Sequence, residues 1–380
     1  MRKSIVLLFV LASVSGFAQI KGVTVLHDFV GGGGSFDDSF VTGMSYGQQV
    51  GHYNFWNPKG YWTGNSVMWE GTVESRIDMT PPGYSNSRVI STHFGKQAGW
   101  VNVGPSTTNA FLWHSSPNDT VNLHTGSIGK TTFVTSEANS IWGDEQVGFA
   151  GVNTGLFGRR AVKWQSTAAS AELLHPEHLA LLNSEALATD GKQQVGAGRD
   201  VNESLRAIVW NGTAASAVDV TPPGADSAEA VGVAGGYQVG STVIAGTRRA
   251  SVWQGSASSW VDLHPEGTYQ SRIYATNGVW HVGSVTRFHV PGREDDEHAV
   301  MWNAATNEMI DLHDYVPPGF DETPSRALSI DELGNVGGYL TSTSTLMYGT
   351  RAAMWVVPEP GTFVALGGGI LLLALRLRKR

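Results

Sequence analysis

The sequence contains no cysteine in its 380 residues. Disulfides, thiolate chemistry and cysteine-ligated metal sites are therefore excluded, and the stability of the fold has to come from a packed core. Charged residues make up only 15%, and 33 acidic residues outnumber 25 basic ones, for a formal net charge of -8. Because binding to a phosphate backbone relies on lysine and arginine, this balance argues against nucleic acid as a partner.

Long apolar runs are also scarce, and the two that occur lie at the ends of the chain. Residues 1–18 (MRKSIVLLFVLASVSGFA) combine a basic start, an apolar stretch and a small-residue exit. This order predicts a secretory signal peptide, cut after Ala18, and export through the Sec translocon. The second run, residues 361–375, is followed by a basic end at residues 376–380. It predicts one C-terminal transmembrane segment whose end stays in the cytoplasm.

Pro358, Glu359 and Pro360 come directly before the second run. This motif, the apolar segment and the basic end together resemble the PEP-CTERM sorting signal of Gram-negative bacteria. The resemblance covers residues 358–380. It implies recognition and removal by an exosortase, so the protein would be anchored transiently in the inner membrane and delivered to the cell surface or the extracellular matrix.

Glycine and tryptophan, by contrast, are abundant, and the tryptophans recur in a pattern. Three short signatures alternate along the chain. Tryptophan closes the first at Trp69, Trp113, Trp164, Trp210, Trp253, Trp302 and Trp355. Histidine or threonine closes the second, eleven residues later, at Thr80, His124, His175, Thr221, His264 and His313. Glycine closes the third at Gly51, Gly99, Gly148, Gly196, Gly240, Gly283 and Gly337. With a Ser/Ala segment before the glycine, each repeat offers four short strands in about 48 residues.

Seven such repeats predict an all-β, seven-bladed β-propeller over residues 19–357. The last tryptophan, Trp355, lacks a following strand, and the predicted mature chain begins with an unpartnered TVLH segment that ends at His27. Joined in one blade, the two halves complete the seventh repeat. We therefore expect a ring closed by strands from both ends of the chain, which removes the free sheet edges. The alternative is an open β-solenoid, which does not require complementary halves.

The repeats also resemble extracellular HAF-type repeats, named for a His-Ala-Phe before the tryptophan. The nearest matches are residues 109–113 (NAFLW) and 298–302 (HAVMW). This resemblance extends over the whole ectodomain and implies secretion and a repeat architecture, without an assigned activity.

The recurring polar residues are expected to be structural. The histidines His27, His124, His175, His264 and His313 lie in different repeats, where symmetry keeps them apart unless they point into the axis, and a single metal ion needs ligands at about 2.1 Å. Threonine replaces histidine twice, which favours a hydrogen-bonding role at a blade turn. Carboxylates two residues earlier, such as Asp262 and Asp311, are expected to form hydrogen bonds or to pair with basic residues such as Arg249 and His298. We predict no catalytic residue, no metal site and no cofactor.

Three long loops, within residues 51–69, 283–302 and 337–355, belong to repeats that are consecutive around the closed ring. Equivalent hairpins emerge on the same face, so ligand binding is expected at this sector of one rim. The first loop carries Tyr53, Trp56, Tyr61 and Trp62, whose rings would stack on sugars or pack the loop onto its blade. Residues 293–298 (REDDEH) form either a solvated acidic tip or a Ca²⁺ site, although they lack the spacing of a calcium loop.

The sequence thus predicts an exported protein that serves as a non-enzymatic binding or structural module of the extracellular polysaccharide. The alternative is a carbohydrate-active enzyme, a glycan hydrolase or lyase on a propeller scaffold. Such an enzyme needs two carboxylates about 5 to 10 Å apart at the mouth of the channel. A structural envelope protein without a glycan ligand is the third possibility.

Overall fold

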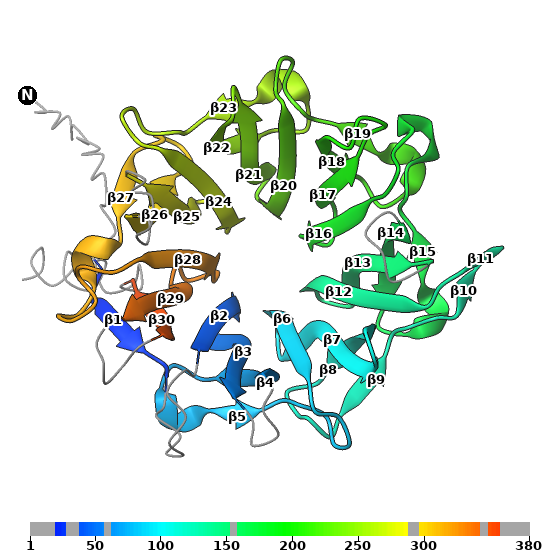
Figure 1. Cartoon of the computed structure of the whole chain (residues 1–380), viewed down its shortest axis with the longest axis horizontal. Helices are drawn as coiled ribbons and strands as arrows, with labels where there is room; N and C mark the ends of the chain where they lie inside the picture. The colour runs from blue at the N-terminus through cyan, green and yellow to red at the C-terminus, as the bar shows by residue number, and fades with distance from the viewer. Residues whose placement is uncertain are drawn as a thin grey trace, which may run out of the picture.

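Seven four-stranded antiparallel sheets surround a central axis as the blades of a propeller (Figure 1). The computed structural model describes residues 20–27, 38–56, 62–152, 158–287, 296–342 and 349–357. The predicted all-β, seven-bladed fold is therefore confirmed. The predicted signal peptide and the predicted sorting segment lie outside the described residues. Within the part of the chain that is described, no helix has the length and apolar character that crossing a membrane requires.

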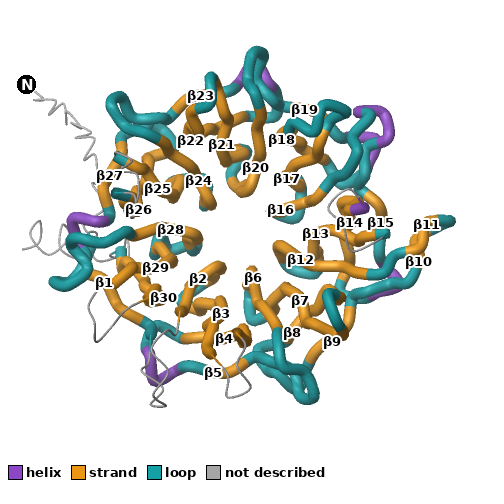
Figure 2. The backbone as a smooth tube through the Cα atoms, viewed as in Figure 1, coloured by secondary structure: helices purple, strands orange, loops and turns teal. Residues whose placement is uncertain are grey.

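Each blade runs from an innermost strand at the axis to a short strand at the rim (Figure 2). Blade 1 consists of β2 (Asp38–Ser45), β3 (Gln48–Trp56), β4 (Trp62–Trp69) and β5 (Ile77–Asp78). Blade 2 consists of β6 (Ser87–His93), β7 (Lys96–Gly104), β8 (Thr107–Trp113) and β9 (Thr120–Asn122). Blade 3 consists of β12 (Thr135–Trp142), β13 (Glu145–Gly151), β14 (Arg159–Gln165) and β15 (Glu172–Leu173). Blade 4 consists of β16 (Glu185–Thr189), β17 (Gln194–Arg199), β18 (Leu205–Trp210) and β19 (Val218–Asp219).

The remaining blades repeat this order. Blade 5 consists of β20 (Ser227–Ala234), β21 (Tyr237–Ile244), β22 (Thr247–Trp253) and β23 (Val261–Asp262). Blade 6 consists of β24 (Gln270–Thr276), β25 (Trp280–Thr286), β26 (Glu297–Asn303) and β27 (Met309–Asp311). Blade 7 consists of β28 (Ser325–Ile330), β29 (Val336–Ser342), β30 (Gly349–Val356) and β1 (Gly22–Val25). A small hairpin, β10 (Ser127–Ile128) and β11 (Thr131–Thr132), follows blade 2. Short 3-10 helices lie in the connections: η1 (Val73–Ser75), η3 (Ala168–Ser170), η4 (Glu177–Leu179), η5 (Ala214–Ser216), η6 (Ala257–Ser259) and η7 (His313–Tyr315).

The ring is closed by β1, which is the outermost strand of blade 7 (Figure 1). It pairs antiparallel with β30, with Thr24 opposite Met354. Beyond the strand, the Leu26 amide donates to the Ala352 carbonyl at 2.8 Å, and the Leu26 side chain is fully buried. The predicted closure by strands from both ends of the chain is therefore confirmed.

The repeated tryptophans pack between blades, and all seven are at most 1% exposed. Trp164 of blade 3 belongs to one core cluster with Leu112 of blade 2. The indole N–H of Trp210 donates to the Leu174 carbonyl of the preceding blade at 2.7 Å. A large ring buries much apolar area, so a single residue per repeat contributes strongly to each interface.

The signature glycines, which lie in the second strand of each blade, let a backbone carbonyl of the innermost strand approach closely. A Cβ atom on Gly148 would lie 1.9 Å from the carbonyl oxygen of Glu137, and the equivalent distances in the other blades are 1.8 to 2.0 Å. In blade 7 the equivalent residue is Gly338 and not Gly337, because a Cβ on Gly338 meets the Arg326 carbonyl at 1.9 Å. Two adjacent glycines made these positions indistinguishable by sequence.

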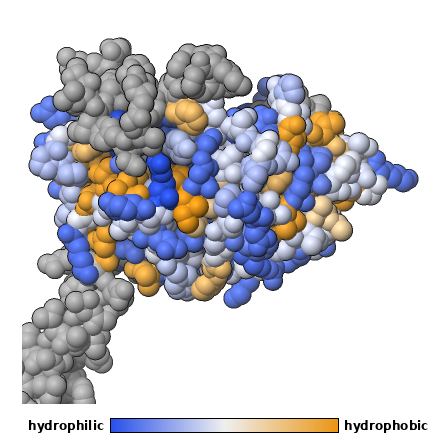
Figure 3. Space-filling view, turned by 90° about the horizontal axis from the view of Figure 1, so that it is seen from below, coloured by the Kyte–Doolittle hydropathy of each residue, from blue (hydrophilic) through white to orange (hydrophobic). Residues whose placement is uncertain are grey.

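The outer wall is a mosaic of hydrophilic residues and small hydrophobic areas (Figure 3). The exposed apolar residues include one on each of several short outermost strands, namely Ile77, Val218, Val261 and Met309. Single exposed apolar residues of this kind are ordinary on a soluble surface.

Candidate functional site

The innermost strands line a cavity of about 360 Å³ on the propeller axis. In every blade the innermost strand has a bulge, which leaves one residue unpaired with the second strand. These residues are Thr42, Ile90, Asn139, Leu187, Val231, Tyr274 and Leu328. All seven line the cavity. A bulge re-aims a side chain out of the sheet, so the repeat supplies the channel lining.

Two residues before each bulge lies a second set of equivalent positions, here called the charged ring. Its members are Phe40, Arg88, Glu137, Glu185, Glu229, Arg272 and Arg326, each of which has its carbonyl against the signature glycine of its blade. Every member is half-buried and is followed by a fully buried residue. Because side chains alternate along a strand, the members point away from that buried face of the blade.

The charges in this ring are segregated. The glutamates occupy blades 3, 4 and 5. The arginines occupy blades 6, 7 and 2, and Phe40 of blade 1 lies between the arginines of blades 7 and 2. Four of the six charged members are compensated in ion pairs, namely Glu185 by Arg159, Glu229 by Arg248 and Arg272, and Arg326 by Glu297.

The charged ring lies at the same end of the propeller as the three predicted long loops. In blade 1 the ring member Phe40 pairs with His52, and the second strand continues only to Trp56, where the long loop begins. In blade 3 the pair is Glu137 and Phe149, near the end of β13 at Gly151. The predicted loops and the ring therefore share one face.

Glu137 is a half-buried acid without an ion pair among the described residues. The Thr108 hydroxyl of blade 2 donates to its Oε1 at 2.9 Å. Burial is the main cause that raises the pKa of Glu137, and the nearby charge of Glu185 raises it further. The raised pKa favours the protonated form, which can donate a proton.

Glu185 occupies the same position one blade further but has a cationic partner. Arg159, the first residue of β14, donates to Glu185 Oε2 at 2.8 Å. The Asn139 amide donates to its Oε1 at 3.1 Å. The guanidinium compensates the charge of this carboxylate directly, whereas it acts on Glu137 without forming an ion pair.

Sequence reasoning missed these two acids, although a signal exists. Each follows a serine and precedes an alanine at the start of an innermost strand: Ser136-Glu137-Ala138 and Ser184-Glu185-Ala186. Placing them together required knowing which face of the strand meets the channel.

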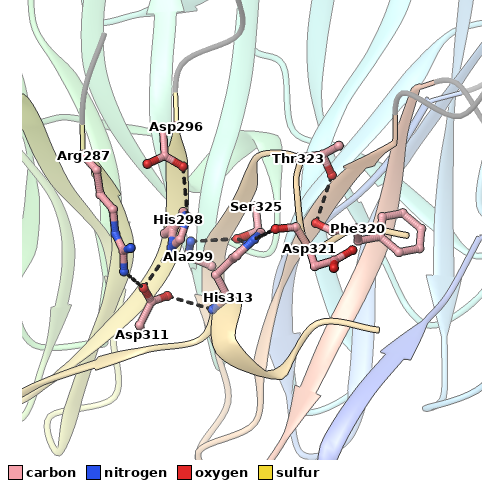
Figure 4. A network of polar contacts seen from close by, with 10 residues as sticks. All are labelled: Arg287, Asp296, His298, Ala299, Asp311, His313, Phe320, Asp321, Thr323 and Ser325. Atoms are coloured by element: carbon pink, nitrogen blue, oxygen red, sulfur yellow. Dashed lines mark hydrogen bonds and ion pairs between the residues drawn. The ribbon is translucent and has the colours of Figure 1, made fainter. Parts of the chain in front are cut away.

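The recurring histidines are structural, as expected, and fasten neighbouring blades together. The Nδ1 atom of His313 lies 2.8 Å from Ser325 Oγ, and this oxygen accepts a hydrogen bond from the Ala299 amide at 2.9 Å (Figure 4). The same pair of histidine and serine occurs at His27, His124, His175 and His264. Burial lowers the pKa of His313 and favours its neutral imidazole. Its Nε2 lies 3.2 Å from the Asp321 carbonyl, which can only accept, so in the neutral ring Nε2 carries the proton and Nδ1 accepts from the serine. Ser325 is fully buried, so the pair is a clasp between blades and not a nucleophile with its base.

The expected pairing of carboxylates with basic residues holds in blades 5 and 6. Arg249 donates to Asp262 at 2.8 Å, and His298 Nδ1 lies 2.8 Å from Asp311 Oδ2 (Figure 4). In blade 4 Arg206 pairs with Asp200 at 2.9 Å instead, and Asp219 forms a hydrogen bond, the other expected role, by accepting from the Thr221 amide at 2.8 Å.

The acidic run at residues 293–298 is only partly described. Its described acids are engaged, Asp296 with His298 and Glu297 with Arg326. No three potential metal ligands come together within the described ranges.

The predicted aromatic contacts remain a prediction. Tyr61 and the side chains of Trp56 and Trp62 lie outside what the structure describes. The ring of Tyr53 stacks on Phe55 with centroids 5.6 Å apart, and its hydroxyl donates to Asp78 at 3.3 Å.

Comparison with protein-family models gives no match, and neither does comparison with curated proteins. Solved structures, however, share the fold. The β-propeller domain of the Trilobed protease from Pyrococcus furiosus, described as having an open velcro topology, has a TM-score of 0.53 at 10% identity, over 86% of this chain and 96% of that chain. An acylaminoacyl peptidase of Pyrococcus horikoshii has a TM-score of 0.54 at 10% identity, over 85% of this chain and 52% of that chain. A puromycin hydrolase has a TM-score of 0.52 at 12% identity, over 80% and 50%.

These similarities overturn the leading functional prediction. These three structures are enzymes or domains of enzymes, and they contradict the prediction of a non-enzymatic matrix module. The alternative, an enzyme on a propeller scaffold, agrees better with them. At 10 to 12% identity the likeness shows the fold alone, and about half of each of the latter two enzymes is not matched.

Proposed function

We propose that this chain is a carbohydrate-active enzyme that cleaves a glycan bound across the charged ring. One observation carries the proposal: Glu137 and Glu185 occupy the same position in neighbouring blades, yet only Glu185 has an arginine partner. Two carboxyl groups with different environments are the arrangement by which one site supplies both an acid and a base.

In this mechanism Glu137 is the general acid. Its raised pKa favours the protonated carboxyl group, and the proton passes to the glycosidic oxygen as the bond to the leaving sugar breaks. The Thr108 hydroxyl fixes the orientation of the carboxyl group through its hydrogen bond to Oε1.

Glu185 is the second carboxylate. It attacks the anomeric carbon directly or removes a proton from the attacking water, according to its distance from the acid. Arg159 and Asn139 hold its two oxygens in place. Direct attack forms a covalent glycosyl-enzyme, which water then hydrolyses with Glu137 as the base, so two inversions give net retention of the anomeric configuration. Direct attack by water inverts the configuration once, so the configuration of the first product distinguishes the two pathways.

We also propose that the chain is exported, with residues 1–18 as the signal peptide and residues 358–380 as the exosortase-recognised segment. The substrate would then be an extracellular glycan. Tyr53, Trp56, Tyr61 and Trp62 are further proposed contacts to it, since their loop and the ring share one face.

The test is release of reducing ends from a panel of polysaccharides by the parent protein and by Glu137→Gln and Glu185→Gln. Each substitution keeps the shape and removes the charge, so we expect a loss of about 10²-fold or more. The matched control is Glu172→Gln, which affects a glutamate at the outer rim that is paired with Lys163. An aryl glycoside with an acidic leaving group needs no proton, so it restores the rate of Glu137→Gln but not that of Glu185→Gln.

The pH profile provides a second readout. The rate of the parent enzyme falls as the pH rises through the raised pKa of Glu137, because the acid then loses its proton, and this limb disappears in Glu137→Gln. Equal rates for parent and both variants would refute the assignment, as would a parent protein that cleaves no glycan of the panel.

A further inference from the structure

The arginine side of the charged ring borders a second cavity, of about 230 Å³. Three guanidinium groups line it, from three consecutive blades: Arg248 of blade 5, Arg272 of blade 6 and Arg326 of blade 7. Tyr274 lines both this cavity and the axial one. The two cavities therefore adjoin at the innermost strand β24.

The charges around this cavity do not balance. Arg248 and Arg272 both donate to Glu229 Oε1 at 2.9 Å, so they share one carboxylate. Arg326 has its own partner, Glu297, which accepts from both its Nε and Nη2. Among the residues that the structure describes, three cations thus face two anions, and one positive charge is left over in a half-buried place.

Arg272 carries most of this imbalance. Its Nε is buried and has no hydrogen-bond partner, whereas buried donors normally have one. Its guanidinium lies over the Tyr274 ring at 4.9 Å from the centroid. The Arg272 side chain is nevertheless 30% exposed, so the accessible part of its guanidinium can meet an acceptor that brings one negative charge.

We infer that this cavity binds the carboxylate of an acidic sugar, so that the substrate is a glycan that contains uronic acid. Guanidinium groups match the planar, two-oxygen geometry of a carboxylate. The neutral polar side chains Gln270, Ser284 and Thr286 also line the cavity and supply partners for sugar hydroxyls. Carboxylate binding stands on the cavity alone, whereas the assignment to a substrate rests on the proposed function.

The experiment is calorimetric titration of the exported protein, carrying Glu137→Gln so that cleavage does not interfere. The probes are glucuronate and galacturonate against glucose and galactose, which differ only in the carboxylate. We expect the uronates to bind about tenfold more tightly or better, as a charge-assisted hydrogen bond provides. This preference should weaken with added NaCl.

The decisive variant is Arg272→Gln, which leaves the pair of Arg248 and Glu229 in place and should abolish the preference for uronates. Its matched control is Arg249→Gln. Arg249 also has a buried Nε without a partner, but it pairs with Asp262 and does not line the cavity. This control should bind uronates like the parent.

Equal binding of uronates and neutral sugars, or an unchanged preference in Arg272→Gln, overturns the inference. Tight binding of inorganic sulfate or phosphate that exceeds that of the uronates also overturns it, because the cavity would then be a site for small anions. The two proposals fail separately. Activity that depends on Glu137 without uronate binding leaves the proposed function intact, whereas uronate binding through Arg272 without such activity leaves only the inference.

Discussion

The clasp between blades makes the stability of the fold depend on pH, and His175 is the sharpest place to measure this. His175 is 6% exposed, and its Nδ1 lies 2.8 Å from Ser184 Oγ of the next blade. Burial, and next the charge of Arg160, lower its pKa from 6.5 to about 4. The folded protein therefore keeps this imidazole neutral at pH values where the unfolded chain protonates it.

The direction of the effect follows from proton binding. Below pH 6.5 the imidazole binds a proton in the unfolded state but not in the folded state, so the free energy of unfolding falls as the pH falls. This decrease ends near pH 4, where the folded state is protonated as well. Between pH 7 and pH 4.5, a pKa of 6.5 unfolded and about 4 folded costs about 2 kcal/mol from this one residue.

The test compares the parent with His175→Thr by urea unfolding at both pH values. Threonine occurs naturally at this position in two repeats, where Thr80 contacts Ser87 at 3.2 Å, so the clasp has a functional substitute. At pH 7 the variant is less stable because it packs less well. At pH 4.5 the difference in the free energy of unfolding between parent and variant is about 2 kcal/mol smaller, because the variant has no imidazole to protonate at this position. Ser184→Ala is the control: it removes the hydroxyl but keeps the imidazole buried, so its difference from the parent does not shrink. A difference that is equal at both pH values for His175→Thr would refute the reasoning.

Two further predictions concern the signature glycines and the ends of the chain. Gly148→Ala places a Cβ 1.9 Å from the Glu137 carbonyl and so displaces β12; we expect the free energy of unfolding in urea to fall by more than about 1 kcal/mol and glycan cleavage to decrease. The control Gly126→Ala, whose Cβ meets no atom within 4 Å, leaves both the stability and the cleavage rate unchanged. The intact mass of the protein recovered from the culture should correspond to a chain that starts at Gln19 and lacks the basic end at residues 376–380; a recovered chain that keeps both segments contradicts the proposed export and sorting.

The sequence predicted the fold because its strongest signals are packing signals. Each interface between blades needs one large aromatic side chain at an equivalent position, and the regular spacing of Trp164, Trp210 and Trp253 indicates these positions in the sequence. The segment ending at His27 predicted the closure, because it offers the one strand that the last repeat, which ends after Trp355, is missing.

The candidate site was less accessible to sequence reasoning. Glu137 and Glu185 become neighbours through the ring, and their electrostatic difference comes from the burial of Glu137 and from the ion pair that Arg159 of the preceding blade forms with Glu185. A local pattern reports the position of a residue within its own blade but not the side chain that the preceding blade places against it. For the same reason the recurring histidines, which form the most conspicuous polar pattern, turned out to be clasps.

The pairing of β1 with β30 brings residues far apart in the chain to one point on the outer rim of blade 7. The Lys21 amide donates to the Val356 carbonyl at 2.8 Å. Residues 20 and 357, between which the whole ring lies, are consequently neighbours at this rim. A tether attached at either residue would hold the propeller by its outer edge and not at the axial cavity.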